Sequence, residues 1–406
     1  MKKTITDKNK IEELLTRGAE EVIEKDHLRK RLLSGEVLRI KLGIDPTGPK
    51  IHLGRATQLL KLRDFQNLGH KIILIIGDFT AQIGDASDKN SARRPLTEDE
   101  VKENMKNYLP QIGKILDLKK AEVYYNSQWL NRLTVKNLLL IAMQFTAQQM
   151  IQRRNFKERW EAGNPIGLHE LYYPLFQGYD SVAIRADVEI GGSDQLFNLK
   201  TGRIVQQFFG QKPQDVMTLK MVYGLDGRKM STTWGNVINI EEPPKEMYGK
   251  VMSMHDELIF DYFETCTRVP LKEIKQMREA LKSKKVNPKE IKSRLAKEIV
   301  AIFWGEKEAD EAQIEFEKIF KEKRMPENVP VIKIKEEKLD ILELLNRTGL
   351  VNSKTQAKRL IGEKGVKIVE GSKKHIIQNW TEDVSIKDGL VVQVGKRRFV
   401  KIKKEK

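Results

Sequence analysis

The sequence predicts an α/β protein, in which a parallel sheet covered by helices is followed by a helical segment and a small basic α+β domain. Strand-like and helix-like stretches alternate in the first half of the chain, which is typical of parallel sheets with helical crossovers. Helical periodicity dominates the third quarter of the chain, and Lys and Arg are concentrated near its end. A chain of 406 residues is long enough for two or three domains, each with its own core.

The first half contains the strand, helix, strand unit from which the sheet is predicted. Val37 to Ile44 is expected to be a strand, Leu53 to Asn67 carries apolar side chains at helical spacing, and Lys71 to Ile76 is a second apolar strand. Such a unit forms a right-handed crossover, and parallel sheets bind their ligands at the carboxyl ends of the strands. The loop that follows the first strand, residues 45–52, is therefore the first candidate binding element.

The rest of the chain divides by periodicity and by proline. Ile291, Leu295 and Ile299 lie on one face of an expected helix, whereas Pro326 and Pro330 interrupt regular structure. The expected parts are a sheet domain at 1–237 with a largely helical insertion at about 97–190, a helical domain at 238–325, a linker at 326–337 and a final domain at 338–406.

The charge of the chain favours a polyanionic partner. The 74 Lys and Arg residues outnumber the 57 Asp and Glu residues, which gives a net charge of +17. A generally basic proteome would give the same total, so the position of the excess is more informative than its size. Residues 338–406 alone contain 17 basic and 8 acidic residues, so this end is the expected site of contact with nucleic acid.

The sequence indicates neither a membrane protein nor a secreted one. Its longest apolar runs, Ile72 to Ile76 and Leu138 to Met143, are far shorter than the roughly 18 residues that span a bilayer. No apolar stretch follows the charged amino end, Met1 to Lys10, which predicts a cytoplasmic location. Cys266 is the only cysteine, so it forms no internal disulfide or multi-cysteine zinc site and is expected to be a packing residue.

The loop after the first strand has the chemistry of a phosphate-binding element. The segment DPTGPKIHLGR at residues 45–55 contributes His52 and Arg55 as donors, and it ends at a helix whose first amides are unpaired. Gly54 leaves room for a flat ring to lie against the backbone. A lone histidine before a helix is more often a cap or a surface residue than a ligand-binding group.

A second segment indicates which family of proteins the loop resembles. GRKMSTT at residues 227–233 lies far downstream, and the two segments together resemble the HIGH and KMSKS signatures of class I aminoacyl-tRNA synthetases. Two positions depart from those signatures, because Arg55 replaces the second histidine of HIGH and Thr232 replaces the second lysine of KMSKS. Arg55 keeps a cation, whereas the change at Thr232 removes one, so a weaker hold on pyrophosphate is expected.

The region between the two motifs narrows the resemblance to one family. Tyr173, Gln177 and Asp180 are spaced as Tyr-x-x-x-Gln-x-x-Asp, and GGSDQ follows at residues 191–195. The chain is thereby identified as a member of the bacterial-type tyrosyl-tRNA synthetases, with a similarity that runs nearly end to end and a tail that resembles an S4 RNA-binding domain. The same spacing without this context would indicate only a solvated helix face.

The resemblance implies a Rossmann-like catalytic domain that activates L-tyrosine with ATP and then transfers it to tRNA(Tyr). It implies Mg2+ bound with ATP through phosphate oxygens and water, no protein-bound structural metal, and a homodimer. Carried over position by position, the expected catalytic residues are Thr47, His52, Arg55 and Lys229. The expected ATP-binding residues are Asp45, Gly54, Gly192, Asp194, Lys229, Met230, Ser231 and Thr232. The expected tyrosine-binding residues are Lys41, at a position where some relatives have tyrosine, with Asp85, Tyr173, Gln177, Asp180 and Gln195.

The basic tail contributes the expected tRNA contacts. Residues 353–356 read as a capping box that opens a helix ending at Gly362, and a short strand is expected at Val366 to Val369. The candidate tRNA-binding residues are Lys354, Lys358 and Arg359 on that helix, and Lys396, Arg397 and Arg398. A solvated charged face would show the same charge pattern.

Three other functions are compatible with parts of the sequence. Small nucleotidyltransferases also carry a His-x-Gly-His loop, but they need no RNA-binding tail. A synthetase relative that only binds RNA is a second alternative, which the changes at Arg55 and Thr232 keep open. The sister enzyme that uses tryptophan is the third.

Overall fold

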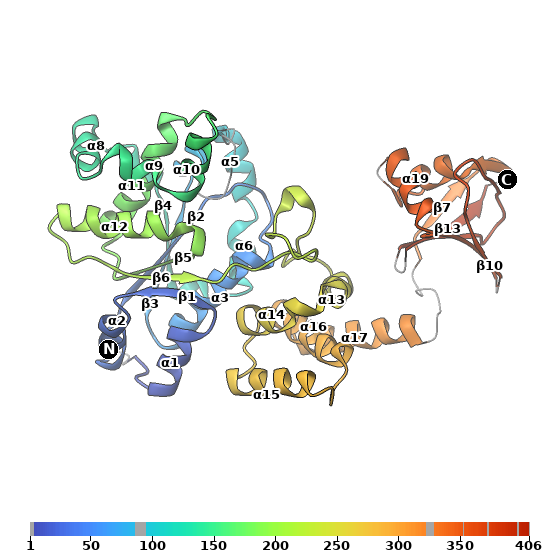
Figure 1. Ribbon diagram of the computed structural model, residues 1–406, viewed down its shortest axis with the longest axis horizontal. Helices are drawn as coiled ribbons and strands as arrows, with labels where there is room; N and C mark the ends of the chain where they lie inside the picture. Colours follow the sequence, from blue (N-terminus) through green and yellow to red (C-terminus); the bar gives the residue numbers. More distant parts are fainter. Residues whose placement is uncertain are drawn as a thin grey trace. The chain divides into compact units, whose positions relative to one another are not determined.

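The computed structural model describes residues 4–85, 95–321, 329–351, 353–371, 373–395 and 398–405. The chain divides into two compact units, Met1–Gln313 and Ile314–Lys406, and each is considered by itself (Figure 1).

The first unit is built on a six-stranded sheet. Its strands run in the order β1-β6-β5-β2-β3-β4, all neighbours being parallel except β1, which pairs antiparallel with β6 at one edge. The strands are β1 (Ala19–Ile23), β2 (Arg39–Ile44), β3 (Lys71–Ile76), β4 (Ala121–Tyr125), β5 (Val188–Gly192) and β6 (Asp215–Leu219). The second expected strand has the predicted bounds, whereas the first begins two residues later than predicted, because Val37 is exposed ahead of the paired segment.

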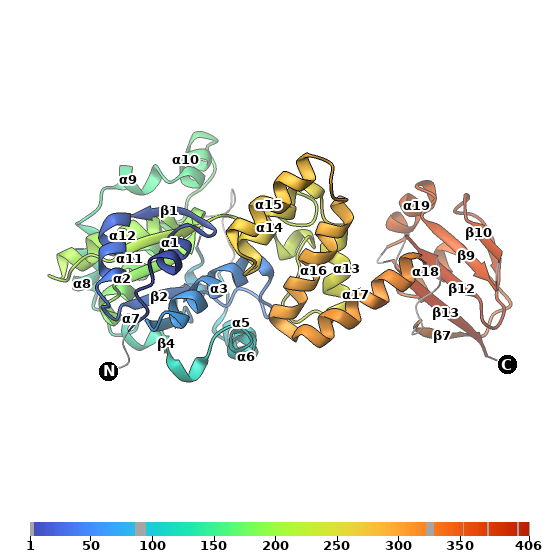
Figure 2. The ribbon, with the colours of Figure 1, turned by 90° about the horizontal axis from the view of Figure 1, so that it is seen from below.

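Helices complete the crossovers of this sheet. The helix α3 (Leu53–Asn67) has the predicted bounds and joins β2 to β3, and it buries Leu59, Leu62 and Phe65. The long helix α11 (Leu168–Ile184) packs beside α12 (Leu196–Phe208), which joins β5 to β6 (Figures 1 and 2). At the amino end, α1 (Lys8–Thr16) and α2 (Lys25–Leu33) flank β1.

The expected helical insertion at about 97–190 is only partly correct. It contains β4 and most of β5, which are strands of the main sheet. Helical patterns on both sides hid β4, whose five residues are all half-buried at the sheet edge and show no alternation. The short helices around it are α4 (Thr80–Ile83), α5 (Glu98–Met105), α6 (Tyr108–Gly113), η1 (Leu118–Lys120), α7 (Ser127–Leu130), α8 (Val135–Ala142), α9 (Ala147–Ile151) and α10 (Arg154–Glu161).

A block of helices follows the sheet in the chain. The short helix η2 (Ser193–Gln195) lies between β5 and α12, and η3 (Thr232–Trp234) precedes the block. The members of the block are α13 (Pro244–Ser253), η4 (Asp256–Leu258), α14 (Ile259–Cys266), α15 (Leu271–Lys282), α16 (Pro288–Trp304) and α17 (Glu306–Lys321). The predicted apolar face of α16 is buried at Ile291, Leu295 and Ile299. Cys266 is also buried, which raises the pKa of its thiol to about 12 and agrees with a packing role.

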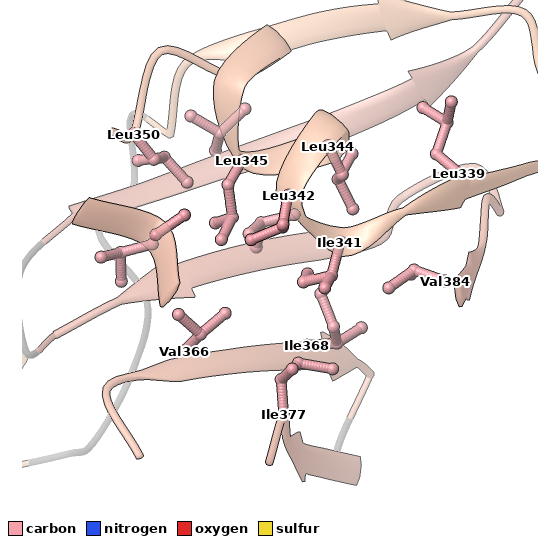
Figure 3. Close-up of a cluster of buried hydrophobic side chains, with 14 of the residues drawn as sticks. Leu339, Ile341, Leu342, Leu344, Leu345, Leu350, Val366, Ile368, Ile377 and Val384 are labelled. Atoms are coloured by element: carbon pink, nitrogen blue, oxygen red, sulfur yellow. The ribbon is translucent and has the colours of Figure 1, made fainter. Parts of the chain in front are cut away.

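The second unit has its own sheet and core. Five strands lie in the order β10-β9-β12-β13-β7, and β11 pairs with β8. The elements are β7 (Val331–Ile334), β8 (Lys338–Asp340), α18 (Ile341–Arg347), α19 (Lys354–Gly362), β9 (Val366–Glu370), β10 (Lys373–Ile376), β11 (Asp383–Ser385), β12 (Val391–Val394) and β13 (Arg398–Lys404). Figure 3 shows the apolar side chains of α18 packed over β9, with Ile341 next to Ile368.

This arrangement changes the boundary expected at 326–337. β7 lies within that stretch and pairs in parallel with β13, from Val331 opposite Lys401 to Ile334 opposite Lys404. The run Val331, Ile332, Lys333 and Ile334 is short and follows a proline, so the sequence did not distinguish it from a linker. No helix in the described part of the chain is both long enough and apolar enough to cross a bilayer.

Candidate active site at the carboxyl ends of the strands

A cavity of about 260 Å³ opens where the parallel strands β2, β3 and β5 end, as expected for this sheet topology. Its lining comes from the loop after β2, from α11, from the turn after β5 and from the segment after β6. The predicted site residues that line it are Asp45, Thr47, His52, Gly54, Arg55, Asp85, Tyr173, Gln177, Asp180, Gly192, Asp194, Gln195, Lys229 and Met230. The two motifs therefore face one cavity, although some 170 residues separate them in the chain.

The first motif is fixed by backbone pairing. His52 is the N-cap of α3 in extended conformation, and the loop is joined to a later segment by hydrogen bonds from Leu53 N to Ile238 O (2.8 Å) and from Ile240 N to Ile51 O (3.0 Å). The side chain of His52 does not cap the helix, and its buried Nδ1 has no partner among the described residues. Burial, with Arg55 and Lys229 nearby, lowers the pKa of His52 to about 3, so its ring is neutral at pH 7.

Arg55 is held in a defined orientation. Its Nη2 donates to Thr47 Oγ1 (2.6 Å) and its Nη1 donates to the hydroxyl of Tyr108 on α6 (2.7 Å). Because a guanidinium has five N–H donors, these two bonds leave others for a ligand in the cavity. The arginine that replaces the second histidine of the motif thus places its positive charge next to Thr47.

The second motif reaches the first. Met230 Sδ lies 3.3 Å from the amide nitrogen of Gly54, and Lys229 Nζ lies 3.4 Å from Asp194 Oδ2. A Cβ on Gly54 would come within 3.1 Å of the His52 ring, so any larger residue there would push the ring aside by a few tenths of an ångström. Lys229 is thereby placed beside the turn after β5.

The loop that carries Lys229 is anchored by one amide side chain. Asn236 accepts from Ser231 N (2.8 Å) and donates to Asp226 Oδ1 (2.8 Å) and Lys229 O (3.0 Å). Ser231 and Thr232, expected to contact ATP, do not line the cavity, and Thr232 is exposed. The loop therefore directs Lys229 and Met230 inward and the next two residues away from the cavity.

At the other end of the cavity lies a buried carboxyl group. Asp180, on α11, accepts from Trp129 Nε1 (2.7 Å) and Asn126 Nδ2 (3.3 Å), and it is only 3% exposed. Burial raises the pKa of Asp180 to about 7, against the lowering effect of Lys41 and of the two hydrogen bonds. An acidic group in this environment can accept a hydrogen bond from a hydroxyl and would be left unpaired by a ligand without one.

Asp45 joins α11 to the loop after β3. Its carboxylate accepts from the Tyr173 hydroxyl (2.8 Å) and from Thr80 Oγ1 (2.8 Å), while the expected contact with ATP stays a prediction. Burial raises the pKa of Tyr173 far above its usual value, so its hydroxyl remains a donor. A Cβ at Gly77 would lie 2.0 Å from Asp45 Oδ1, so a side chain at that position would displace the Asp45 carboxylate from its bond with Thr80.

Three other expected tyrosine-binding residues are connected through Asn198. Its Nδ2 donates to Gln177 Oε1 and to Gln195 Oε1, both at 3.0 Å, and Gln195 Nε2 donates to Asp85 Oδ2 (2.7 Å). Asp85 also pairs with the buried Arg153 (3.3 Å). This side of the cavity thus presents a carboxylate and two amides, a suitable set for a ligand with both ammonium and carboxylate groups.

Lys41 is the one expected tyrosine-binding residue that lies outside the cavity lining. Its ammonium group is fully buried and bonded to Glu189, Gln177 and Ser181 on the side of β2 that faces α11. The prediction of direct contact with the substrate is therefore not supported by its position. A lysine that is buried needs acceptors for its charge, and here all of them are supplied by the protein.

Comparison with known proteins agrees with this geometry. The sequence family described as tRNA synthetases class I (W and Y) matches residues 33–321. The tyrosine--tRNA ligase of Thermotoga maritima is 45% identical over 391 residues, which cover 96% of each chain. That of Coxiella burnetii is 45% identical over 398 residues, covering 96% of this chain and 98% of the relative. The chain belongs to the tyrosyl-tRNA synthetases.

Solved structures agree on the fold of this synthetase. A C-terminally truncated mitochondrial tyrosyl-tRNA synthetase of Aspergillus nidulans superposes with a TM-score of 0.63 at 21% identity, covering 77% of this chain and 95% of that one. The tyrosyl-tRNA synthetase of Archaeoglobus fulgidus, solved with L-tyrosine, gives 0.60 at 24% identity, covering 75% of this chain and 99% of that one. At these identities the likeness concerns the fold alone.

In the second unit of the synthetase, the expected basic helix is present. α19 begins after the N-cap Ser353 and ends at Gly362, and Lys354, Lys358 and Arg359 are exposed on it. Lys358 Nζ lies 4.0 Å from the ring centroid of Trp380. Arg398, at the start of β13, is also exposed and donates to Leu350 O (2.6 Å). Lys396 and Arg397 lie outside the described residues.

Sequence reasoning missed several side chains that build the synthetase site. Asn126 and Trp129 follow β4 and bind Asp180, and Tyr108 orients Arg55. Asn126 and Trp129 lie just after a strand, and Tyr108 is the first residue of a helix. These positions would have indicated the site only if β4 had been predicted as a strand. Within the ranges that the structure describes, no group of three His, Cys, Asp or Glu side chains is arranged to hold a metal ion.

Proposed function

We propose that the chain joins tyrosine to tRNA(Tyr) in two steps at the cavity described above, as a tyrosine--tRNA ligase. The aminoacyl-tRNA synthetase activity follows from its family, in which relatives 45% identical over 96% of the chain carry that name. The observation that supports the location best is that one cavity joins Lys229, Arg55 and His52 at one end to Asp180 at the other.

The first step needs positioned donors and no enzyme nucleophile. A carboxylate oxygen of tyrosine bonds to the α-phosphorus of ATP, the bond from that phosphorus to the bridging oxygen breaks, and its electron pair leaves with pyrophosphate. Arg55 and Lys229 supply positive charge where negative charge grows on the leaving group, and Thr47 adds a hydroxyl. His52, being neutral, contributes a hydrogen bond rather than charge.

ATP enters with Mg2+ as part of the substrate, coordinated mainly by phosphate oxygens and water. Asp194 accepts from ribose hydroxyls, and Gly54 and Gly192 let the nucleoside approach the backbone. This assignment of Gly192 is supported by its tight surroundings, since a Cβ there would lie 2.6 Å from Asp194 Oδ1.

Asp180 selects the phenol. Its ionised form accepts from the substrate hydroxyl, and phenylalanine would leave that buried charge without the bond. Asp85, Tyr173 and Gln177 surround the substrate ammonium, and Gln195 lies toward its carboxylate. A buried acid accepts from an indole N–H as well as from a phenol hydroxyl, as it does from Trp129 here, so the choice of tyrosine over tryptophan is supported by the relatives named tyrosine--tRNA ligase.

The second step, transfer of the tyrosyl group to the 3' end of tRNA, depends on the rest of the chain. Residues 1–237 form the catalytic part, residues 238–325 contact the anticodon stem, and the S4-like segment that begins with β7 at Val331 binds the tRNA through α19 and the start of β13. Phosphate-directed Lys354, Lys358 and Arg359 position the RNA with little base discrimination of their own.

The enzyme acts in the cytoplasm as a homodimer. Support for a second copy comes from α8, where Val135, Leu139 and Met143 form a stripe at helical spacing and are 74%, 52% and 76% exposed. Exposed apolar stripes of this kind are typical of protein interfaces.

Pyrophosphate exchange into ATP, measured with each amino acid in turn, tests the proposal. Exchange that depends on tyrosine alone is the expected result. Exchange with tryptophan would assign the sister activity, and absence of exchange together with tight tRNA binding would assign a non-catalytic RNA-binding role.

A further inference from the structure

Lys41 has no hydrogen left for a ligand. Its Nζ lies 2.9 Å from Glu189 Oε1, 2.9 Å from Gln177 O and 2.8 Å from Ser181 Oγ. An ammonium group has three N–H donors, so these three acceptors use all of them. The side chain is completely buried, and it is not part of the lining of the main cavity.

Glu189 is the matching partner on the next strand. It stands opposite Lys41 in the parallel register of β2 and β5, and it is 1% exposed. Besides Lys41, its carboxylate accepts from Gln177 Nε2 (3.0 Å), Ser181 Oγ (3.2 Å) and Gln214. The ion pair therefore holds both the backbone and the side chain of Gln177, as well as the residue that follows Asp180.

From Gln177 the hydrogen bonds continue into the cavity. Gln177 Oε1 accepts from Asn198, which also donates to Gln195, and Gln195 donates to Asp85. One continuous chain thus runs from the ion pair inside the sheet to the groups assigned to the ammonium and carboxylate of the substrate. Asp180, between the two anchored residues of α11, also feels the charge of Lys41.

We propose that the Lys41–Glu189 pair is a positioning element of the tyrosine subsite, which fixes the segment of α11 from Gln177 to Ser181 and orients Gln177 without touching the substrate. This inference rests on the proposed function, and it replaces the expectation that Lys41 itself binds tyrosine. A buried pair is costly to desolvate and adds little net stability, so its use here is more consistent with fixing one arrangement of polar groups.

The pair also explains why neither partner can be changed alone. Removing one charge leaves the other buried and unpaired, whereas replacing both with neutral groups of similar size restores balance. The two single variants and their combination therefore separate positioning from direct contact.

The test uses the full chain with Lys41→Met, Glu189→Gln and the double variant, in tyrosine-dependent pyrophosphate exchange. We expect each single variant to raise the KM for tyrosine at least tenfold and to change the KM for ATP less than twofold. We expect phenylalanine to lose efficiency as well, because the pair fixes Gln177 in addition to the segment that carries Asp180. The double variant should recover most of the loss, so that its KM for tyrosine lies within about threefold of the wild type.

The chain offers a matched control in Lys61. It is a second buried lysine, on α3, and it donates to Leu14 O and Arg17 O, each at 2.7 Å, away from the Asp180 end of the cavity. Lys61→Met removes a buried charge of the same kind and should lower thermal stability without separating the two KM values. If Lys41→Met fails to fold, Ser181→Ala, which removes one acceptor of Lys41, should still raise the KM for tyrosine selectively.

Other outcomes would overturn the proposal. A loss for tyrosine but not for phenylalanine in Lys41→Met, with Glu189→Gln silent, would mean that Lys41 contacts the phenol. Equal increases in both KM values, or losses that multiply in the double variant, would reduce the pair to general structural support. A wild-type enzyme that exchanges only with another amino acid would overturn the proposed function instead, and the same KM comparison would then be made with that amino acid.

Discussion

The sulfur of Met230 lies 3.3 Å from the amide nitrogen of Gly54. This contact joins the loop after β2 to a segment some 170 residues later, and it lies beside Lys229 and the unpaired Nδ1 of His52. Side chains from both motifs therefore meet in one part of the cavity lining. A change in either motif should therefore be measurable in the activation of tyrosine with ATP.

Replacing Asp180 should change the pH dependence of tyrosine use. Because the pKa of Asp180 is about 7, kcat/KM for tyrosine should rise with pH through that value as the carboxylate forms. kcat/KM for phenylalanine should lack this limb, and Asp180→Asn should remove it while lowering tyrosine activation roughly tenfold to a hundredfold. Pyrophosphate exchange from pH 5.5 to 8.5 measures both, and an unchanged limb in the variant would contradict the role.

The same group should leave a signature in stability. The native state keeps the proton of Asp180 where the unfolded chain, with a pKa near 3.8, has lost it, so this residue makes the free energy of unfolding fall as pH rises from about 4 to about 7. Below about pH 4 and above about pH 7 its contribution should be constant. Thermal melts of wild type and Asp180→Asn across this range measure the effect. The stability of the wild type relative to Asp180→Asn should fall between about pH 4 and about pH 7 and should not change with pH outside that window.

Tyr108→Phe should weaken catalysis through Arg55. The variant removes the hydroxyl that accepts from Arg55 Nη1 while leaving the charge in place. We expect kcat for activation to fall about tenfold, the equivalent of roughly one hydrogen bond. Tyr125→Phe, which removes a hydroxyl from the edge strand β4, is the control, and an equal fall in both variants would argue against a specific role for Tyr108.

Thr232→Lys should strengthen the hold on ATP. Thr232 is exposed outside the cavity, so a lysine there acts through a movement of the loop that carries Lys229. We expect the KM for ATP to fall about two- to fivefold, the range for one exposed charge pair. Ser283→Lys, on an exposed turn of the helical block, controls for net charge. An unchanged KM for ATP would contradict the prediction that the missing lysine weakens the hold on ATP.

Charge reversal on α19 should separate the two steps. The combination Lys354→Glu, Lys358→Glu and Arg359→Glu should abolish tRNA charging and spare tyrosine-dependent exchange, because these exposed cations lie in the second unit. Lys333→Glu with Lys335→Glu, on β7 and just after it, is the matched control. Loss of exchange as well as charging in the α19 variant would contradict the division of labour.

Leu139→Glu should disrupt the dimer. The residue lies at the centre of the apolar stripe on α8, and a charge there would be buried without a partner in an interface. Sedimentation should show a monomer, whereas Val37→Glu, at a similarly exposed position ahead of β2, should leave the mass unchanged. A dimer that persists in Leu139→Glu would place the interface elsewhere.

The parts that sequence reasoning predicted well are those with local signals. α3 and β3 have the predicted bounds because apolar spacing and a following glycine or polar residue define them. The motif residues meet because strand ends in a parallel sheet share one edge. β4 and β7 were missed since each is short and borders a pattern of another kind.

Side-chain partnerships were harder to predict. Nothing in the sequence near Lys41 indicates that Glu189, 148 positions later, lies opposite it on the adjacent strand. Tyr108 and Trp129 could not be assigned without knowing which helix starts beside the cavity. Asp45 is expected near ATP because of its motif, and nothing in that motif indicates that its oxygens also accept from Thr80 and Tyr173.

The hydrogen-bond chain through Asn198 has an energetic consequence for the arriving amino acid. Gln195 donates a hydrogen bond to Asp85, so tyrosine must replace this hydrogen bond with its own rather than bind to unpaired groups. Only the difference between the two sets appears as affinity. Because every amino acid carries the ammonium and carboxylate groups that make this exchange, the choice between side chains is left to Asp180.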